Sequence, residues 1–417
     1  MFRFIHAADI HLDSPLRGLE SYEDAPVEEI RGASRRAFDN LVEFAIEEEV
    51  GFVLLSGDLY DGEWKDYHTG LFLADRMGRL KRQDIRVFVV SGNHDAASQI
   101  TRTLQLPDNV QVLSTKKPQT ILLDHIGVAI HGQGYQSRAM ANNLAAQYPR
   151  RMPEYFNIGI LHTALNGREG HEPYAPCTLD DLRQKGYDYW ALGHVHKREE
   201  VSKYPWIVFP GNIQGRHIRE TGAKGASLVT VENGEVTAVA HHALDVLRWS
   251  VCRVDLSACE ALEAVHEHVR QALEKEQEQA DGRILAVRLV LTGACPVHPR
   301  LIEDSAHLRE SFRSMAVGLG DMWLEKVLFK TGRKESLKNA LGEVTPVAGL
   351  LTAVEQFELD GGRLLGLVPE VAALKSKLPP DLIEGDDPWL PTAPDQISAF
   401  LADVKEILTS KLLNSRE

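Results

Sequence analysis

Gly57-Asp58-Leu59-Tyr60-Asp61 follows Phe52-Val53-Leu54-Leu55, a short apolar run that is typical of a buried parallel strand. The run ends at Ser56-Gly57, so Asp58 lies just beyond the carboxyl end of the expected strand. Open α/β sheets bind their ligands at this edge. An aspartate after a strand and a glycine more often belongs to a turn or caps a helix. This stretch therefore indicates a functional site only if similar polar blocks follow other strands of the chain.

The first two-thirds of the chain alternates between expected strands and helices. In order, these are strand 2–7, an irregular insertion over 13–30, helix 31–49, strand 52–56, helix 68–82 and strand 87–90. This β-α-β-α-β order predicts a parallel sheet with right-handed crossovers. Further on, the pattern predicts a β-hairpin from 120–123 and 128–131, and strands at 157–161, 187–192, 206–209 and 226–232. Asn233-Gly234 after the last of these is a hairpin-turn signal.

Five of these strands end in polar blocks that contain candidate metal ligands. The candidates are Asp9, His11, Asp58, Asn93, His162, His194 and His196. Imidazole, carboxylate and carboxamide donors suit Mn²⁺, Fe²⁺ or Zn²⁺. Residues two apart in extended backbone project to the same side, so Asp9 with His11 and His194 with His196 would form two facing pairs. Such pairs with a carboxylate between them can hold two cations about 3.5–4 Å apart.

Each block alone has an ordinary explanation, such as a surface histidine or a turn. Their joint occurrence in this order, each after an apolar strand, favours a two-metal site. The four cysteines are far apart and form no CxxC pair, which argues against a disulfide framework or a zinc-thiolate site.

Composition sets the broad class. The chain has 417 residues, enough for two or three domains, with 43% hydrophobic and 25% charged residues, as in ordinary globular proteins. It has no apolar run that could cross a membrane, and the first residues lack the layout of a signal peptide, so we expect a cytoplasmic protein without membrane association. The net charge of −14 means that any nucleic-acid contact must be local. Candidates for phosphate contacts are Arg216, His217, Arg219 and Lys224.

The motifs DxH, GDxxD, GNHD, a single histidine and GHxH, in this order over roughly residues 1–240, resemble those of the calcineurin-like metallophosphoesterases. The resemblance implies an α/β, sandwich-like core and a role for each matching position. Asp9, His11 and His196 would hold one metal, Asn93, His162 and His194 the other, and Asp58 would bridge both. His94 matches the family's catalytic histidine, and Asp61 matches an acid that orients it in many relatives. Some nuclease members have histidine at that last position, which leaves the role of Asp61 open.

Within this superfamily the chain looks most similar to the SbcD-type DNA repair nucleases, and closest to their YhaO-like branch. The residues that carry this likeness are 8–13, 57–61 and 209–225. The likeness implies DNA as substrate and two divalent metal ions, with Mn²⁺ expected and Fe²⁺ or Zn²⁺ as alternatives. It also implies that the C-terminal tail binds an SMC-like ATPase, although a tail that packs on its own chain fits the pattern nearly as well.

After residue 245 the pattern changes. A strand over 249–256, a capping box at Ser257-Ala258-Cys259-Glu260, a helix and a strand over 283–291 predict a small α/β accessory cap domain. We therefore divide the chain into a catalytic domain over 1–245, an accessory domain over 246–334 and a helical C-terminal region over 335–417. The sequence leaves open whether the protein forms a homodimer.

The sequence thus predicts a two-metal phosphodiesterase that acts on DNA, as an exonuclease or endonuclease in repair. One alternative is a phosphatase or cyclic-nucleotide phosphodiesterase with the same site, but such an enzyme has no obvious use for the residues after 245. A non-catalytic scaffold is the alternative from another class. Scaffolds of this kind usually lose metal ligands, and here every ligand position is filled.

Overall fold

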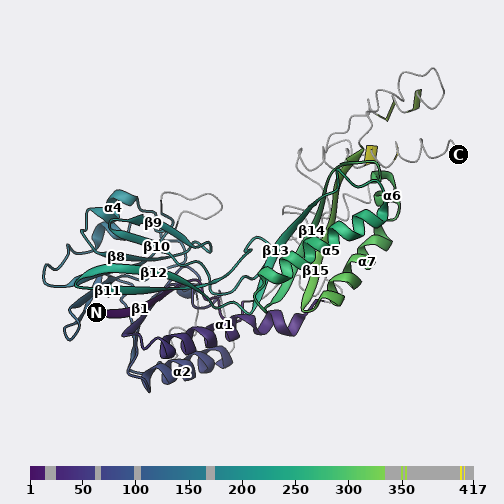
Figure 1. Cartoon of the computed structure of the whole chain (residues 1–417). Coiled ribbons are helices and arrows are strands. Elements are labelled where there is room, and N and C mark those ends of the chain that lie inside the picture. Colours follow the sequence, from purple (N-terminus) through teal and green to yellow (C-terminus); the bar gives the residue numbers. More distant parts are fainter. Residues whose placement is uncertain are drawn as a thin grey trace. The chain divides into compact units, whose positions relative to one another are not determined.

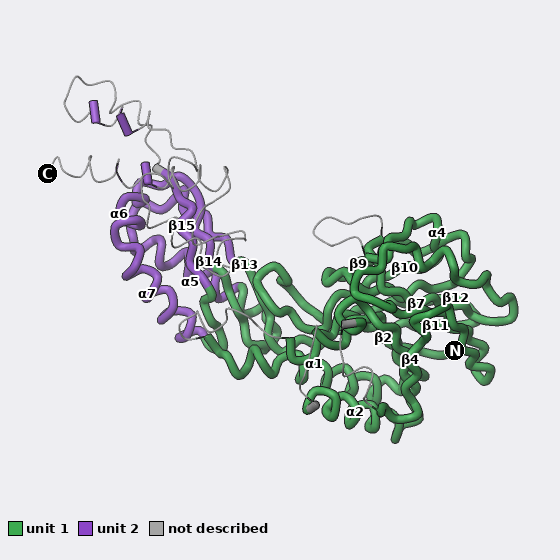
Figure 2. The backbone as a smooth tube through the Cα atoms, turned by 180° about the vertical axis from the view of Figure 1, so that it is seen from behind, with its two compact units in different colours: residues 1–251, 276–288, 320–325 green, residues 252–275, 289–319, 326–417 purple. Residues whose placement is uncertain are grey.

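The computed structural model describes residues 1–14, 25–61, 67–97, 105–165 and 174–333, together with 349–350, 353–354, 404–405 and 408. The predicted insertion over 13–30 is described only in part, and almost all of the predicted helical region after residue 335 lies outside the described residues. Among the helices that are described, none has the length and apolar character that a membrane crossing requires. The chain divides into two compact units, coloured separately in Figure 2.

The first unit contains two six-stranded mixed sheets (Figure 1). The first sheet has the spatial order β12 (Glu235–Ala243), β11 (Gly225–Glu232), β1 (Phe2–Ala7), β2 (Phe52–Ser56), β3 (Arg86–Val90) and β4 (Val110–Val112). The second has the order β5 (Gln119–Leu123), β6 (Val128–Gly132), β7 (Phe156–His162), β8 (Tyr189–Gly193), β10 (Trp206–Phe209) and β9 (Glu199–Lys203). The helical segments are α1 (Val27–Glu47), α2 (Tyr67–Lys81), η2 (Asp95–Ala97), η3 (Ala145–Gln147) and α4 (Leu179–Arg183).

The predicted β-α-β-α-β unit is confirmed. Strands β1, β2 and β3 are parallel neighbours, with Phe4 opposite Phe52 and Phe52 opposite Arg86. The predicted hairpin is also confirmed as the antiparallel pair β5–β6. Asn233 and Gly234 form the β11–β12 turn with φ angles of 52° and 82°. These left-handed angles are what a tight hairpin turn requires, and asparagine and glycine adopt them most easily.

The core lies between the two sheets because alternate residues of each strand face inward. Phe52 and Leu54 of β2 pack in one cluster with residues of β6, β7 and β8. Val53 and Leu55 point to the opposite face, where they pack against Phe38 and Leu41 of α1 together with residues of α2. The outer face of the second sheet has its own apolar cluster, which includes Trp190, Leu182 of α4 and Ala145 of η3. The result is a four-layered sandwich that holds the strand ends rigidly.

The accessory region forms a small parallel sheet in the order β13-β14-β15. Its elements are β13 (Leu247–Asp255), α5 (Leu262–Gln279), β14 (Ile284–Cys295), α6 (His298–Glu303), α7 (Ser305–Leu319) and β15 (Met322–Arg333). The sequence pattern predicted only the first β-α-β unit, and α6, α7 and β15 form a second crossover that it did not predict. The predicted capping box at Ser257 is wrong. Helix α5 begins at Leu262, and Ser257 instead donates to Asp255 in a turn.

Helix α1 begins at Val27, four residues before the predicted start, and the cap residue Pro26 makes no side-chain hydrogen bond. Two features support the added turn. Glu28 and Glu29 place negative charge at the positive end of the helix dipole. Ile30 is buried in a cluster with Trp249 and Trp323, which lie far away in the sequence and could not be read from local pattern.

The inward-facing ring of Phe52 provides a test of this core. The ring is fully buried and stacks on Phe4 with a centroid separation of 5.0 Å. We expect Phe52→Ala to lower the free energy of unfolding by about 3–5 kcal/mol, because it removes apolar contact and leaves a cavity. Leu122→Ala on β5, whose side chain is 40% exposed, should change it by less than about 0.5 kcal/mol. Urea denaturation measures both, and a small loss for Phe52→Ala would contradict the packing described.

Candidate dinuclear metal centre

The site is built where β1, β2, β3, β7 and β8 end, because their polar C-terminal blocks meet there. The loops after β1 and β2 run side by side, with the Asp9 amide donating to Gly57 O at 3.0 Å and the His11 amide donating to Asp58 O at 3.0 Å. The His194 amide donates to both carboxylate oxygens of Asp9, at 3.1 and 3.0 Å, and so joins the second sheet to the first. Backbone hydrogen bonds therefore fix the relative positions of the candidate ligands.

The backbone of four candidate ligands is left-handed. Asp9, His11, Asp58 and His194 have φ angles of 51°, 46°, 53° and 103°, although the sequence predicted extended backbone for Asp9, His11 and His194. Each such conformation costs about 1–3 kcal/mol for a residue other than glycine. The extended-strand argument for pairing Asp9 with His11 and His194 with His196 was therefore wrong in its geometry, although these side chains do reach the same site.

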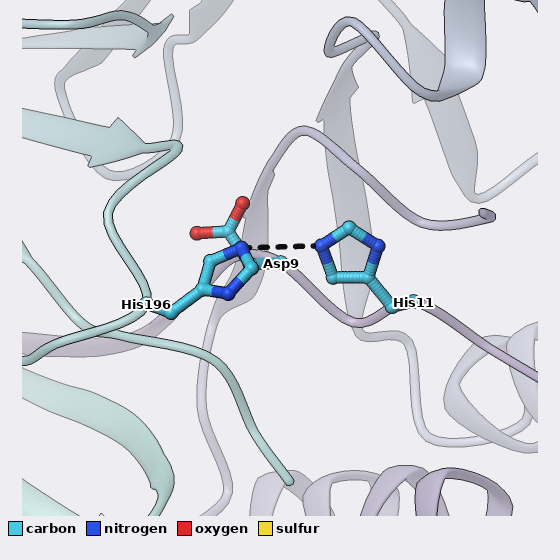
Figure 3. Close-up of side chains that lie close together, drawn as sticks. All are labelled: Asp9, His11 and His196. Atoms are coloured by element: carbon cyan, nitrogen blue, oxygen red, sulfur yellow. Dashed lines mark hydrogen bonds between the residues drawn. The ribbon is translucent and has the colours of Figure 1, made fainter. Parts of the chain in front are cut away.

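One group of possible ligands is Asp9, His11 and His196, whose donor atoms all lie within 4.8 Å of one another (Figure 3). The Nε2 atoms of His11 and His196 face each other at 3.3 Å. His196 donates its Nδ1–H to Glu220 Oε1 at 2.6 Å, which leaves a lone pair on Nε2. Burial and the charge of Arg216 hold the pKa of His11 well below its ordinary value, so this imidazole is neutral. Two imidazole Nε2 atoms with an adjacent carboxylate are a donor set for one divalent cation.

A second group is Asp9, Asp58 and His162. His162 donates its Nδ1–H to the carbonyl oxygen of Ser56 at 2.9 Å. Its Nε2 then faces two acceptors, Asn93 Oδ1 at 3.0 Å and Asp58 Oδ2 at 3.3 Å. Once Nε2 has lost its proton, this nitrogen and the two oxygens are all electron-pair donors that converge on one place, and these residues therefore fit a second divalent ion. The site thus has donor groups for two divalent metal ions, with Asp58 next to both groups.

The pKa of His162 also reflects the negative charge of the site. Burial lowers this pKa, but the charge and hydrogen bond of Asp58 and the charge of Asp9 outweigh burial and raise it to about 9. A proton on His162 thus neutralises the carboxylates where a metal ion would otherwise do so.

Two glycines leave room for these side chains. A Cβ on Gly92 would lie 2.2 Å from Asp58 Oδ1, and one on Gly57 would lie 2.4 Å from His162 Nδ1. Gly57 also has a φ of +95°, which other residues rarely adopt. Glycine is therefore required at both positions for the ligands to approach each other.

His94 lies at the more exposed side of the site. Its Nδ1 is 2.7 Å from Asp61 Oδ1, and its ring packs edge-on against His11 with a centroid separation of 5.0 Å. Burial lowers the pKa of His94, but the hydrogen bond to Asp61 and the charges of Asp58 and Asp61 raise it above the ordinary value overall. His94 also forms a group of potential ligands with His11 and Asp58, so proximity alone does not separate it from the metal-binding residues. The orienting position that the resemblance implied for Asp61 agrees with this contact.

His194 is buried beside the second group, with its ring centroid 5.2 Å from that of His162. The structure therefore brings all seven predicted ligands to one strand edge, although His194 and Asn93 are not members of the close groups of acidic and histidine side chains. Lys224, predicted as a phosphate contact, is buried and donates its Nζ–H to the carbonyl oxygen of His196 at 2.9 Å. Lys224 therefore holds the backbone at His196 in place and does not point towards a bound phosphate.

Sequence reasoning missed Glu220 and Ser14. Glu220 is buried and accepts hydrogen bonds from His196, Asn212 and the Arg216 amide. Ser14 donates to Asp61. An acid within a glycine-rich loop between two strands was the available signal for Glu220. No local pattern distinguished Ser14 from an ordinary loop serine.

Comparison with known proteins agrees with this site. The family model for calcineurin-like phosphoesterases matches residues 2–198, and the model for the middle domain of the metallophosphoesterase YhaO matches residues 249–332. The chain is 39% identical over 297 residues to a protein of Bacillus subtilis described as an uncharacterized metallophosphoesterase YhaO, covering 70% of this chain and 72% of that protein. The chain belongs to the YhaO family of calcineurin-like metallophosphoesterases. Because the chain belongs to this family and has donor groups for metal ions, it is a metal-dependent phosphoesterase.

This YhaO-family protein also has more distant relatives described as the DNA double-strand break repair protein Mre11. The one from Methanopyrus kandleri is 29% identical over 231 residues, covering 50% of this chain and 48% of that protein. The one from Sulfurisphaera tokodaii is 25% identical over 290 residues, covering 66% of this chain and 69% of that protein.

Metal binding should release a proton from His162. With a pKa of about 9, the imidazolium persists in the metal-free protein at pH 7.5, and a metal ion must displace its proton. This proton stabilises the metal-free fold fully below about pH 6.5, and the stabilisation is lost as the pH rises through 9. Calorimetric titration with Mn²⁺ at pH 7.5, in buffers of different ionisation enthalpy, should show about one proton released that His162→Gln no longer releases. Equal proton release by both proteins would contradict this assignment.

Proposed function

We propose that the protein is a two-metal phosphodiesterase that cleaves DNA. The observation that supports this most strongly is the similarity to two proteins described as DNA double-strand break repair proteins, one alignment covering 66% of this chain. That alignment is longer than the phosphoesterase match over residues 2–198, so it includes residues outside that match. We therefore infer the substrate class from the similarity over much of the chain, and the reaction chemistry from the donor groups of the site.

The metal ions, when bound, would activate the nucleophile and neutralise the charge that develops on the phosphate. We assign Asp9, His11 and His196 to one ion, Asn93, His162 and His194 to the other, and Asp58 to both. We expect Mn²⁺, because a donor set of oxygen and imidazole ligands without thiolate suits it.

His94 would supply a proton to the leaving oxygen. Its side chain is 28% exposed, whereas those of His11 and His162 are at most 1% exposed, so it can reach a substrate that the ligands cannot. Asp61 holds its Nδ1, which leaves Nε2 for the substrate. Burial lowers its pKa, but the hydrogen bond to Asp61 and the charges of Asp58 and Asp61 raise it overall, which favours the protonated form that a general acid requires.

The remaining parts of the proposal concern the whole protein. Residues 246–334 would form an accessory domain that contacts DNA, and residues 335–417 would bind an SMC-like ATPase partner. We place the protein in the cytoplasm.

Replacement of His94 tests the assignment of the acid. We expect His94→Gln to keep its metal content while kcat on DNA and on bis(p-nitrophenyl) phosphate falls by about 10²–10⁴-fold. His125→Gln, in an exposed turn, should leave kcat unchanged. Loss of metal in His94→Gln would show that His94 is a ligand, and unchanged kcat would show that no acid is needed.

The same protein with Mn²⁺ distinguishes the substrate classes. The proposal predicts cleavage of linear duplex DNA and faster hydrolysis of the chromogenic diester than of p-nitrophenyl phosphate. A preference for the monoester without DNA cleavage would indicate a phosphatase. Full metal content without activity on any of the three substrates would indicate a scaffold.

A further inference from the structure

Two carboxylates outside the proposed ligand set each hold a histidine of the site by its Nδ1. Asp61, in the loop after β2, lies 2.7 Å from His94 Nδ1. Glu220, in the loop between β10 and β11, lies 2.6 Å from His196 Nδ1. A carboxylate at this position fixes both the tautomer and the orientation of an imidazole. The proposed acid and one proposed metal ligand are thus positioned by separate segments of the chain.

The guanidinium of Arg216 lies between these two carboxylates. Its Nη1 is 3.4 Å from Asp61 Oδ2, and its Nη2 is 3.4 Å from Glu220 Oε1. The Arg216 amide also donates to Glu220 Oε2 at 2.7 Å, and Nη1 lies 3.4 Å from Ser14 Oγ, which donates to Asp61. The contacts form one continuous series from His94 through Asp61, Arg216 and Glu220 to His196.

The loop that carries Arg216 is itself held firmly. The Trp249 indole donates to the carbonyl oxygen of Gly215 at 3.1 Å, and Gln214 Nε2 donates to that of Leu247 at 2.6 Å. Asn212 Nδ2 donates to Glu220 Oε2 at 2.9 Å. The backbone of Arg216 is thus fixed, and its side chain is only 17% exposed. A planar guanidinium can meet two carboxylates at once, whereas a lysine ammonium is a single point of charge.

We propose that Arg216 is a positioning residue that couples His94 to His196 by bridging Asp61 and Glu220. The inference rests on the proposed phosphodiesterase function. A direct contact between Arg216 and the substrate phosphate is the competing role. Bridging is favoured because each terminal nitrogen of the guanidinium already contacts a carboxylate and the side chain is only 17% exposed.

Arg216→Ala, Arg216→Lys and Arg79→Ala form the test set. Arg79 is the control because it pairs with Glu43 at 2.6 Å on the helical face of the same unit, away from the strand-end site. Circular dichroism and thermal unfolding first establish that each variant folds. Arg216→Lys keeps the proposal testable if Arg216→Ala does not fold.

We expect Arg216→Ala to weaken Mn²⁺ binding by about 10-fold in calorimetry without substrate, and to lower kcat on bis(p-nitrophenyl) phosphate at saturating Mn²⁺ by about 10–100-fold. KM and the inhibition constant of inorganic phosphate should stay within about twofold of wild type, because ground-state binding is not removed. Arg216→Lys should recover only part of kcat, because it cannot meet both carboxylates. Added guanidinium chloride at low millimolar concentration should raise kcat of Arg216→Ala and not that of Arg79→Ala.

Three results would overturn the proposal. Unchanged Mn²⁺ affinity with an increase in KM and in the phosphate inhibition constant would assign Arg216 to the substrate. Full activity of Arg216→Lys would show that charge suffices without a bridge. If Mn²⁺ affinity, kcat and KM of Arg216→Ala all equal those of the wild type, Arg216 has no role in the site. If wild-type protein binds Mn²⁺ but hydrolyses no diester, the proposed function fails, while the Mn²⁺ affinities still decide whether Arg216 positions His196.

Discussion

The structure depends on a cluster of buried acceptors that only a cation can reconcile. Asp9, His11, Asp58 and His162 are at most 2% exposed, and their carboxylate and imidazole lone pairs converge at the ends of the strands. Burying an unpaired carboxylate costs several kcal/mol, and two carboxylates together cost more because they also repel each other. A proton on His162 offsets part of this cost, and divalent metal ions would offset more of it because each carries two positive charges. Glycines at 57 and 92, the left-handed backbone of the proposed ligands, and the carboxylates of Asp61 and Glu220 all follow from the need to bring these groups together.

The sandwich supplies the free energy that such a site requires. Left-handed backbone at Asp9, His11 and Asp58 is unfavourable in isolation, yet each of these residues directly follows or neighbours a strand that is buried on both faces. The loops after β1 and β2 hydrogen-bond to each other, and His194 of the second sheet hydrogen-bonds to Asp9 of the first. A displacement of either sheet would therefore separate the proposed ligands. Glu220 and Arg216 continue this network of contacts, because with Asp61 they connect the proposed ligand His196 to the more exposed His94.

Much of this could be predicted from the sequence because the relevant signals were local. Apolar runs such as 52–55 marked the strands, Asn233-Gly234 marked a turn, and the polar blocks marked the strand ends. The errors came where long-range contacts decide. Helix α1 gains its first turn from the packing of Ile30 on Trp249 and Trp323, and Ser257 bonds to Asp255 instead of capping α5. The backbone of Asp9 and His11 could not be read from their spacing, because hydrogen bonds to Gly57 and Asp58 set it. Glu220 could not be predicted from local sequence either, because only the fold brings it next to His196.

In the proposed assignment Asp58 is the ligand that both ions share, and its carboxylate belongs to a group with His11 and His94 and to a group with Asp9 and His162. The most direct test counts metal ions per chain by elemental analysis after equilibration with Mn²⁺ and removal of unbound metal. The account predicts two per chain for wild-type protein and for Asp75→Ala on the exposed side of α2, and less than about one for Asp58→Ala, since a bridging ligand serves both ions. Two tightly bound ions in Asp58→Ala would contradict a shared ligand and, with it, the dinuclear centre described.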